Sequence, residues 1–154
     1  MEVRTPLFDR LVDRAPKLRH EVRPSRTLDR RGLLESVCRE LERLLNTRCP
    51  FPVHRLADRP RSVIDYGLPE LTGFSAHRLD DRERLAELIR RTIEAFEPRL
   101  AEVRVRLEPV AGDALSLTGH IDALFQGDSV TEPVSFHTVV ETRSGKVEVV
   151  HGGA

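Results

Sequence analysis

Two of the strands predicted near the C-terminal end carry imidazole and carboxyl groups. The apolar residues of each strand alternate with polar ones, so His120, Asp122, His137 and Glu141 should share one face of the sheet. Two imidazoles and two carboxylates could form a metal site or an acid–base pair. The alternation, however, assigns this face to solvent, and nothing in the sequence encloses a substrate there. We therefore interpret the four residues as surface polar groups and predict no metal and no cofactor.

Glu97 could be one carboxylate of a glycosidase pair, with Glu94 or Glu102 as the second. Such catalysis needs a cleft that raises the pKa of one of the two carboxyls, and it usually needs aromatic side chains on which the sugar rings stack. The chain has no Trp and a single Tyr. The sequence also lacks the glycine-rich phosphate loops, the zinc-protease motif and the serine-hydrolase motif. We predict no catalytic residue, and a hydrolase that uses Glu97 is the less favoured alternative.

Glu97, Pro98 and Arg99 form a hinge between a predicted helix and a predicted strand. Before the hinge, apolar residues recur at helical spacing: Leu85, Leu88, Ile89, Ile93 and Phe96. After it, apolar and charged residues alternate as in a half-buried strand: Val103, Val105 and Leu107 against Arg104, Arg106 and Glu108. Pro98 has no N–H to donate and disfavours the α conformation of the preceding residue, so the helix should end there.

The other elements follow from the same periodicities. An earlier amphipathic helix is predicted from Asp29, its N-cap, to about Thr47, and the helix before the hinge should open with a capping box of Asp80 and Glu83. Strands are predicted at about residues 102–108, 115–124, 133–141 and 146–150. The short connections imply antiparallel pairing. We predict an α+β fold with two main amphipathic helices packed on an antiparallel meander of about four strands.

The N-terminal residues 1–27 are predicted to form a flexible arm. They hold many arginines and one short apolar cluster, Leu7, Phe8, Leu11 and Val12, which is too small to stay ordered alone. The remaining residues, 28–154, should form a single α+β domain.

Composition excludes several classes of protein. The chain of 154 residues is 39% hydrophobic and 32% charged, which is typical of a soluble globular protein. No apolar run is long enough to insert into a membrane, and no secretion signal follows Met1, so we expect a cytoplasmic protein. A formal net charge of zero argues against general nucleic-acid binding.

Four stretches, taken in order, resemble one family. They are residues 7–11, 36–48, 62–71 and 96–100, which read LFDRL, SVCRELERLLNTR, SVIDYGLPEL and FEPRL. They resemble the TssE baseplate subunits of the type VI secretion system, which are similar to the phage-tail baseplate wedge protein historically called lysozyme-like. Asp65 and Glu70 depart from the Asn and Asp that the family pattern leads us to expect.

The resemblance implies a structural protein and not an enzyme. It implies an α+β wedge subunit beside TssF, TssG and TssK, which templates the first ring of contractile sheath subunits at the cytoplasmic face of the inner membrane. Glu97, Pro98 and Arg99 form the family's hallmark motif and are expected to contact wedge partners. We extend this expectation to Leu7, Phe8 and Leu11 of the arm. A small regulatory adaptor of the same fold is the alternative.

Two physical expectations accompany this resemblance. A sheath template must offer an unpaired strand edge, and the short apolar strand at 147–150 is a candidate. We also expect Glu97 or Arg99 to be incompletely neutralised within the subunit and to complete its hydrogen bonds on a partner.

Overall fold

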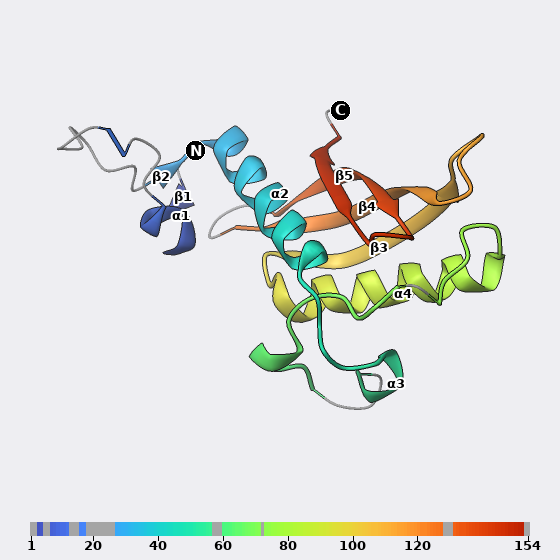
Figure 1. Ribbon diagram of the computed structural model, residues 1–154. Helices are drawn as coiled ribbons and strands as arrows, with labels where there is room; N and C mark the ends of the chain where they lie inside the picture. Colours follow the sequence, from blue (N-terminus) through green and yellow to red (C-terminus); the bar gives the residue numbers. More distant parts are fainter. Residues whose placement is uncertain are drawn as a thin grey trace. The chain divides into compact units, whose positions relative to one another are not determined.

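The computed structural model describes residues 3–4, 7–12, 16–17, 27–56, 60–71, 73–127 and 131–152. The chain divides into two compact units, residues 1–37 and 38–154, and the division falls inside helix α2 (Arg30–Asn46). Figure 1 shows the elements in sequence order.

The first unit holds three short elements and the beginning of α2. β1 (Val3–Arg4) pairs antiparallel with β2 (Thr27–Leu28), and α1 (Leu7–Leu11) lies between them in sequence. Asp29 is the N-cap of α2 as predicted, because its Oδ1 accepts a hydrogen bond of 2.7 Å from the N–H of Gly32. Most of the predicted arm, residues 1–27, lies outside the described residues, so its flexibility stays a prediction.

The second unit contains a four-stranded antiparallel sheet in the order β3-β4-β5-β6. The strands are β3 (Leu100–Pro109), β4 (Ser116–Gln126), β5 (Thr131–Glu141) and β6 (Val147–His151). Each strand pairs with the next along the chain, so the predicted meander is confirmed. In β4 and β5 alternate residues are buried, as the sequence pattern indicated.

Helix α4 (Leu79–Phe96) runs along β3 and buries its apolar stripe (Figure 1). Leu85, Ile89 and Ile93 are at most 2% exposed, as are Ile121 and Phe136 of the sheet. These side chains form the core of the second unit, and burial of each such side chain contributes about 1.5–3 kcal/mol. Two short helices, α3 (Val53–Leu56) and the 3-10 turn η1 (Val63–Asp65), occupy the Pro- and Gly-rich segment before α4.

The predicted capping box of Asp80 and Glu83 is wrong. Helix α4 begins two residues earlier than expected, at Leu79, and its N-cap residue is Arg78 instead of Asp80 and makes no side-chain cap. Asp80 therefore lies inside the first turn, where a carboxylate interacts favourably with the helix dipole. A reciprocal pair of this kind does occur at η1, where the N–H and hydroxyl of Ser62 donate to Asp65 Oδ2 and the N–H of Asp65 donates to the carbonyl of Ser62.

Candidate functional site

The hinge is a tight turn that connects the end of α4 to β3, which is an edge strand of the sheet. The last helical hydrogen bond runs from the N–H of Glu97 to the carbonyl of Ile93 at 2.8 Å. The N–H of Leu100 then donates to the carbonyl of Glu97 at 3.0 Å, so Pro98 lies at the tip of the turn. The predicted helix end at Phe96 is confirmed, and β3 begins at Leu100.

Glu97 and Arg99 bind each other across this turn. The guanidinium of Arg99 donates from Nε to Glu97 Oε1 at 2.7 Å and from Nη2 to Oε2 at 2.5 Å. The side chain of Glu97 is 6% exposed and that of Arg99 is 22% exposed. The two charges compensate each other within the subunit, because a spacing of two residues around a proline turn brings the planar groups into a two-pronged contact. The expectation that one of them completes its hydrogen bonds on a partner stays a prediction.

Beside the hinge, η1 displays two large apolar side chains on a rigid base. Val63 is 86% exposed and Ile64 is 61% exposed, whereas Asp65 directly after them is fully buried. The hydrogen bonds between Ser62 and Asp65 fix the turn, and Arg61 Nη1 donates to the carbonyl of Asp65 at 3.1 Å. Sequence reasoning missed this turn, although the spacing of Ser62 and Asp65 is the signature of a capping box.

An aromatic contact holds η1 next to the hinge. The ring of Tyr66, directly after η1, meets Phe96 edge to face with centroids 5.2 Å apart. Burial raises the pKa of Tyr66, and the negative charges of Glu40 and Glu97 raise it further. In Figure 1 η1 is the green turn near the C-terminal end of α4. We call the exposed Val63, Ile64 and Pro98, together with the half-buried Arg99, the hinge surface.

The histidines and carboxylates of the sheet lie on one face but do not assemble into a site. His120 and His137 are cross-strand partners with ring centroids 4.8 Å apart. Asp122 instead accepts hydrogen bonds from Ser135 Oγ at 2.5 Å and from Arg106 Nη2 at 2.8 Å, which lower the pKa of its carboxyl. Within the described ranges no three His, Cys, Asp or Glu residues are grouped to hold a metal ion.

The predicted contact residues of the N-terminal segment lie on α1. Leu11 is 74% exposed. The side chains of Leu7 and Phe8 lie outside the described part of the structure, so a role in partner binding for these three residues stays a prediction.

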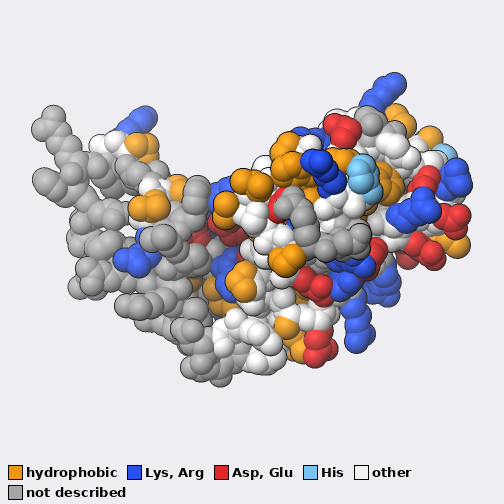
Figure 2. All heavy atoms as spheres, turned by 90° about the horizontal axis from the view of Figure 1, so that it is seen from below, with side chains coloured by type: hydrophobic (Ala, Val, Ile, Leu, Met, Phe, Trp, Pro, Cys, Tyr) orange, Lys and Arg blue, Asp and Glu red, His pale blue; other side chains and the backbone are white. Residues whose placement is uncertain are grey.

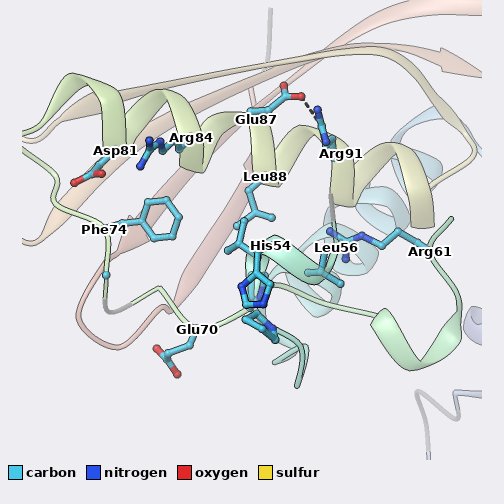
Figure 3. Close-up of a pocket in the computed structure, with 14 residues that line it drawn as sticks. His54, Leu56, Arg61, Glu70, Phe74, Asp81, Arg84, Glu87, Leu88 and Arg91 are labelled. Atoms are coloured by element: carbon cyan, nitrogen blue, oxygen red, sulfur yellow. Dashed lines mark hydrogen bonds and ion pairs between the residues drawn. The ribbon is translucent and has the colours of Figure 1, made fainter. Parts of the chain in front are cut away.

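A pocket of about 710 Å³ lies between α4 and the segment that carries α3 (Figure 3). Its wall is made by Leu56 of α3, Leu88 of α4 and Phe74 between them, and charged groups from α4 line its rim. Sequence reasoning missed the pocket, because its residues come from segments up to forty positions apart.

Glu87 on that rim is held by two arginines. Its carboxylate accepts hydrogen bonds of 2.7 Å from Arg90 and from Arg91. The hydrogen bond from Arg90 is the main reason that the pKa of Glu87 falls to about 2, and Arg91 lowers it further against the opposing effect of burial. A carboxyl whose pKa is lowered by folding stabilises the fold when the pH is above the pKa that the group has in the unfolded chain. This stabilisation is lost as the pH falls through the pKa of the folded chain.

Replacing Glu87 with glutamine should therefore lower the free energy of unfolding at pH 7 by about 1 kcal/mol, since the pair is well exposed and screened by solvent. The difference from the unchanged chain should shrink between pH 4.5 and pH 2 and vanish below that range. Urea unfolding at several pH values measures it, with Glu83→Gln as an exposed control on the same helix. An equal loss at pH 2 and pH 7 would show that the carboxylate charge is not the cause.

The molecular surface mixes charges of both signs. On the face seen in Figure 2, acidic and basic side chains are interspersed and hydrophobic side chains reach the surface between them. Among the described residues, no helix has the length and apolar character needed to cross a membrane.

The chain was compared with solved structures, with curated proteins and with protein-family models. Among solved structures, a chain of "The baseplate complex from the type VI secretion system" is similar with a TM-score of 0.49 and 18% sequence identity, over 72% of this chain and 96% of that one. Comparison with curated proteins gave no match. The family model of the baseplate wedge protein gp25 matches residues 31–130, which include η1, α4 and the hinge. The chain therefore belongs to the gp25 family of baseplate wedge proteins.

Proposed function

We propose that this chain is a structural subunit of a type VI secretion baseplate wedge and works through protein–protein contacts. The family membership supports a structural baseplate role, and the four sequence stretches that resemble TssE subunits support the secretion system. The observation that carries the proposal is the turn η1, which exposes Val63 and Ile64 and is held to the end of α4 by the contact of Tyr66 with Phe96. Exposed large apolar side chains on a fixed backbone are typical of protein-binding sites.

The state of Glu97 argues for binding rather than catalysis. A general acid or nucleophile must reach a substrate in a cleft. The carboxylate of Glu97 is buried and both of its oxygens accept hydrogen bonds from Arg99. In our proposal Glu97 positions Arg99 and the turn, and Pro98 and Arg99 contact the partner.

The sheet offers an edge for a strand of a sheath subunit. The N–H of Glu141 donates to the carbonyl of Lys146, and the N–H of Gly152 donates to the carbonyl of Ser135. In an antiparallel pair every second residue bonds to the neighbouring strand, so the main-chain groups of Val149 and His151 point away from β5. We propose that a partner strand pairs with these two residues by β-augmentation.

Features at both edges of the sheet favour Val149 and His151 of β6 as the residues that pair with a partner strand. At the start of β6, Asn46 already occupies the outward groups of Val147, donating to its carbonyl at 2.7 Å and accepting from its N–H at 2.9 Å. The opposite edge, on β3, is interrupted by an irregular register at Glu102, whose φ is 52°, and ends in Pro109. Bulges and prolines hinder strand addition.

The proposed function predicts co-purification with larger wedge proteins. The tagged chain should recover TssF-, TssG- and TssK-type proteins when they are produced together in the cytoplasm. The measurement is the amount of each partner recovered per mole of tagged chain, with the tag alone as control. Recovery of no wedge protein, or of one small partner by a stable monomer, would favour the regulatory adaptor instead.

A further inference from the structure

We propose that Asn46 determines the register in which a strand of a sheath subunit pairs with β6. The inference rests on the strand addition proposed above and names the residue of this chain that positions the added strand. Asn46 is the last residue of α2, and its side chain binds Val147, the first residue of β6 whose main-chain groups face outward. The amide of Asn46 takes the place of one residue of an added strand there.

The amide of Asn46 binds Val147 in the way that a strand residue does. In a hydrogen-bonded pair of an antiparallel ladder, one residue gives its N–H and its carbonyl to the same partner residue. Asn46 Nδ2 donates to the carbonyl of Val147 at 2.7 Å, and Oδ1 accepts from the N–H of Val147 at 2.9 Å. The outward main-chain groups of Val147 are therefore already paired.

Helix α2 holds this amide in one orientation. Asn46 Nδ2 also donates to the carbonyl of Glu42, one turn earlier in the helix, at 2.7 Å. Turning the amide over would place its oxygen against two carbonyls and its nitrogen against an N–H, so all three hydrogen bonds would be lost. A partner strand must displace this fixed amide before it can pair with Val147.

The alternation of side chains along β6 does not set the register by itself. The main-chain groups of Val147, Val149 and His151 face outward, at every second residue. A partner strand that slides by two residues keeps each side chain on its own face, because side chains alternate with a period of two. The register at Val147 and Val149 is thus equivalent in pattern to the register at Val149 and His151, and Asn46 removes the first.

A second contact lies at the same end of the edge. Arg48, two residues after Asn46, donates from Nη2 to the carbonyl of Ser144 in the hairpin that precedes β6. Its guanidinium lies so close to Gly145 that a Cβ at this glycine would be 2.0 Å from Nη2. A partner strand that continued past Val147 would therefore meet the segment that follows α2.

The test compares amide hydrogen exchange in the free full chain and in its complex with the purified sheath subunit. Exchange in the complex is stopped with acid, and the released chain is read residue by residue by NMR. In the unchanged chain, binding should slow exchange of the N–H groups of Val149 and His151 by about tenfold or more. The N–H of Val147 should be protected equally with and without the subunit, because Asn46 binds it in both states.

Two variants separate the hydrogen bonds of Asn46 from its shape. Asn46→Leu keeps nearly the same shape without polar groups, and Asn46→Ala removes both. In each variant the N–H of Val147 should exchange about tenfold faster in the free chain, and the sheath subunit should then slow it, because a slipped strand can pair there. Asn46 is exposed, so neither change opens a cavity in the core, and thermal unfolding checks the fold. Glu42→Ala is the matched control, since Glu42 is exposed at the same end of α2 and keeps its main-chain carbonyl.

The possible outcomes distinguish this inference from the proposed function. If exchange at Val147 stays independent of the subunit in both variants, Asn46 does not set the register. If only Asn46→Ala makes it dependent, the shape of the side chain and not its amide closes the edge, which also overturns the inference. If the subunit slows neither Val149 nor His151 in the unchanged chain, the proposed strand addition is wrong and the inference falls with it. Co-purification with the larger wedge proteins would still test the wedge function separately.

Discussion

Replacing Arg99 with alanine should destabilise the second unit by about 3–5 kcal/mol, the range for breaking one side of a buried ion pair. The reason is the position of its partner. The Glu97 side chain is 6% exposed and would keep a charge with neither the guanidinium nor water to compensate it. Glu97→Ala should destabilise the second unit less than Arg99→Ala, because Arg99 is 22% exposed and its flexible side chain can reach solvent.

Arg106→Ala is the matched control for this prediction. Arg106 also binds a carboxylate, Asp122, at 2.8 Å, but the two side chains are 69% and 39% exposed. An exposed pair contributes at most about 1 kcal/mol. Arg99→Lys should fall between the two, since an ammonium group cannot reproduce the two-pronged contact. Urea unfolding of the isolated protein measures all four variants, and equal losses for Arg99→Ala and Arg106→Ala would contradict the structural role of the hinge pair.

The double substitution Val63→Ser and Ile64→Ser should weaken binding of the wedge by about a hundredfold in Kd, which corresponds to about 3 kcal/mol. Burial of a Val or Ile side chain contributes about 1.5–3 kcal/mol, and the fixed backbone of η1 means that little ordering is required on binding. The stability of the chain alone should hardly change, because both side chains are mostly exposed.

The control for this prediction is Leu79→Ser. Leu79 is 58% exposed at the first turn of α4, far along that helix from η1. Binding of the purified wedge proteins to each variant gives the change in Kd, and thermal unfolding checks the fold. Unchanged affinity in the double variant, or an equal loss with Leu79→Ser, would show that η1 is not part of the interface.

These two predictions separate the role of the hinge pair, Glu97 and Arg99, from that of the exposed side chains of η1. Glu97 and Arg99 stabilise the turn by binding each other, so their loss should affect folding before it affects assembly. Val63 and Ile64 contribute nothing comparable to the fold, so their loss should affect assembly alone. Experiments on Glu97 or Arg99 that measure only assembly would not distinguish the two effects.

The sequence by itself determined the features that depend on local periodicity. The end of α4 at Phe96 follows from Pro98, and the alternate burial in β4 and β5 follows from the alternation of apolar residues. The family was also evident from short stretches, three of which lie within the matched residues 31–130. Each of these signals lies within a few consecutive residues, where the geometry of the backbone fixes which side chains share a face.

Only the tertiary structure decided which charged and polar groups meet. The pairing of Glu97 with Arg99 depends on the turn that Leu100 closes, and Asn46 reaches Val147 across 101 positions. The exposure of Val63 and Ile64 depends on where the surrounding segment packs, because nothing in their own apolar character distinguishes a core residue from a contact residue. Such contacts are set by long-range packing, which a local pattern of residues does not contain.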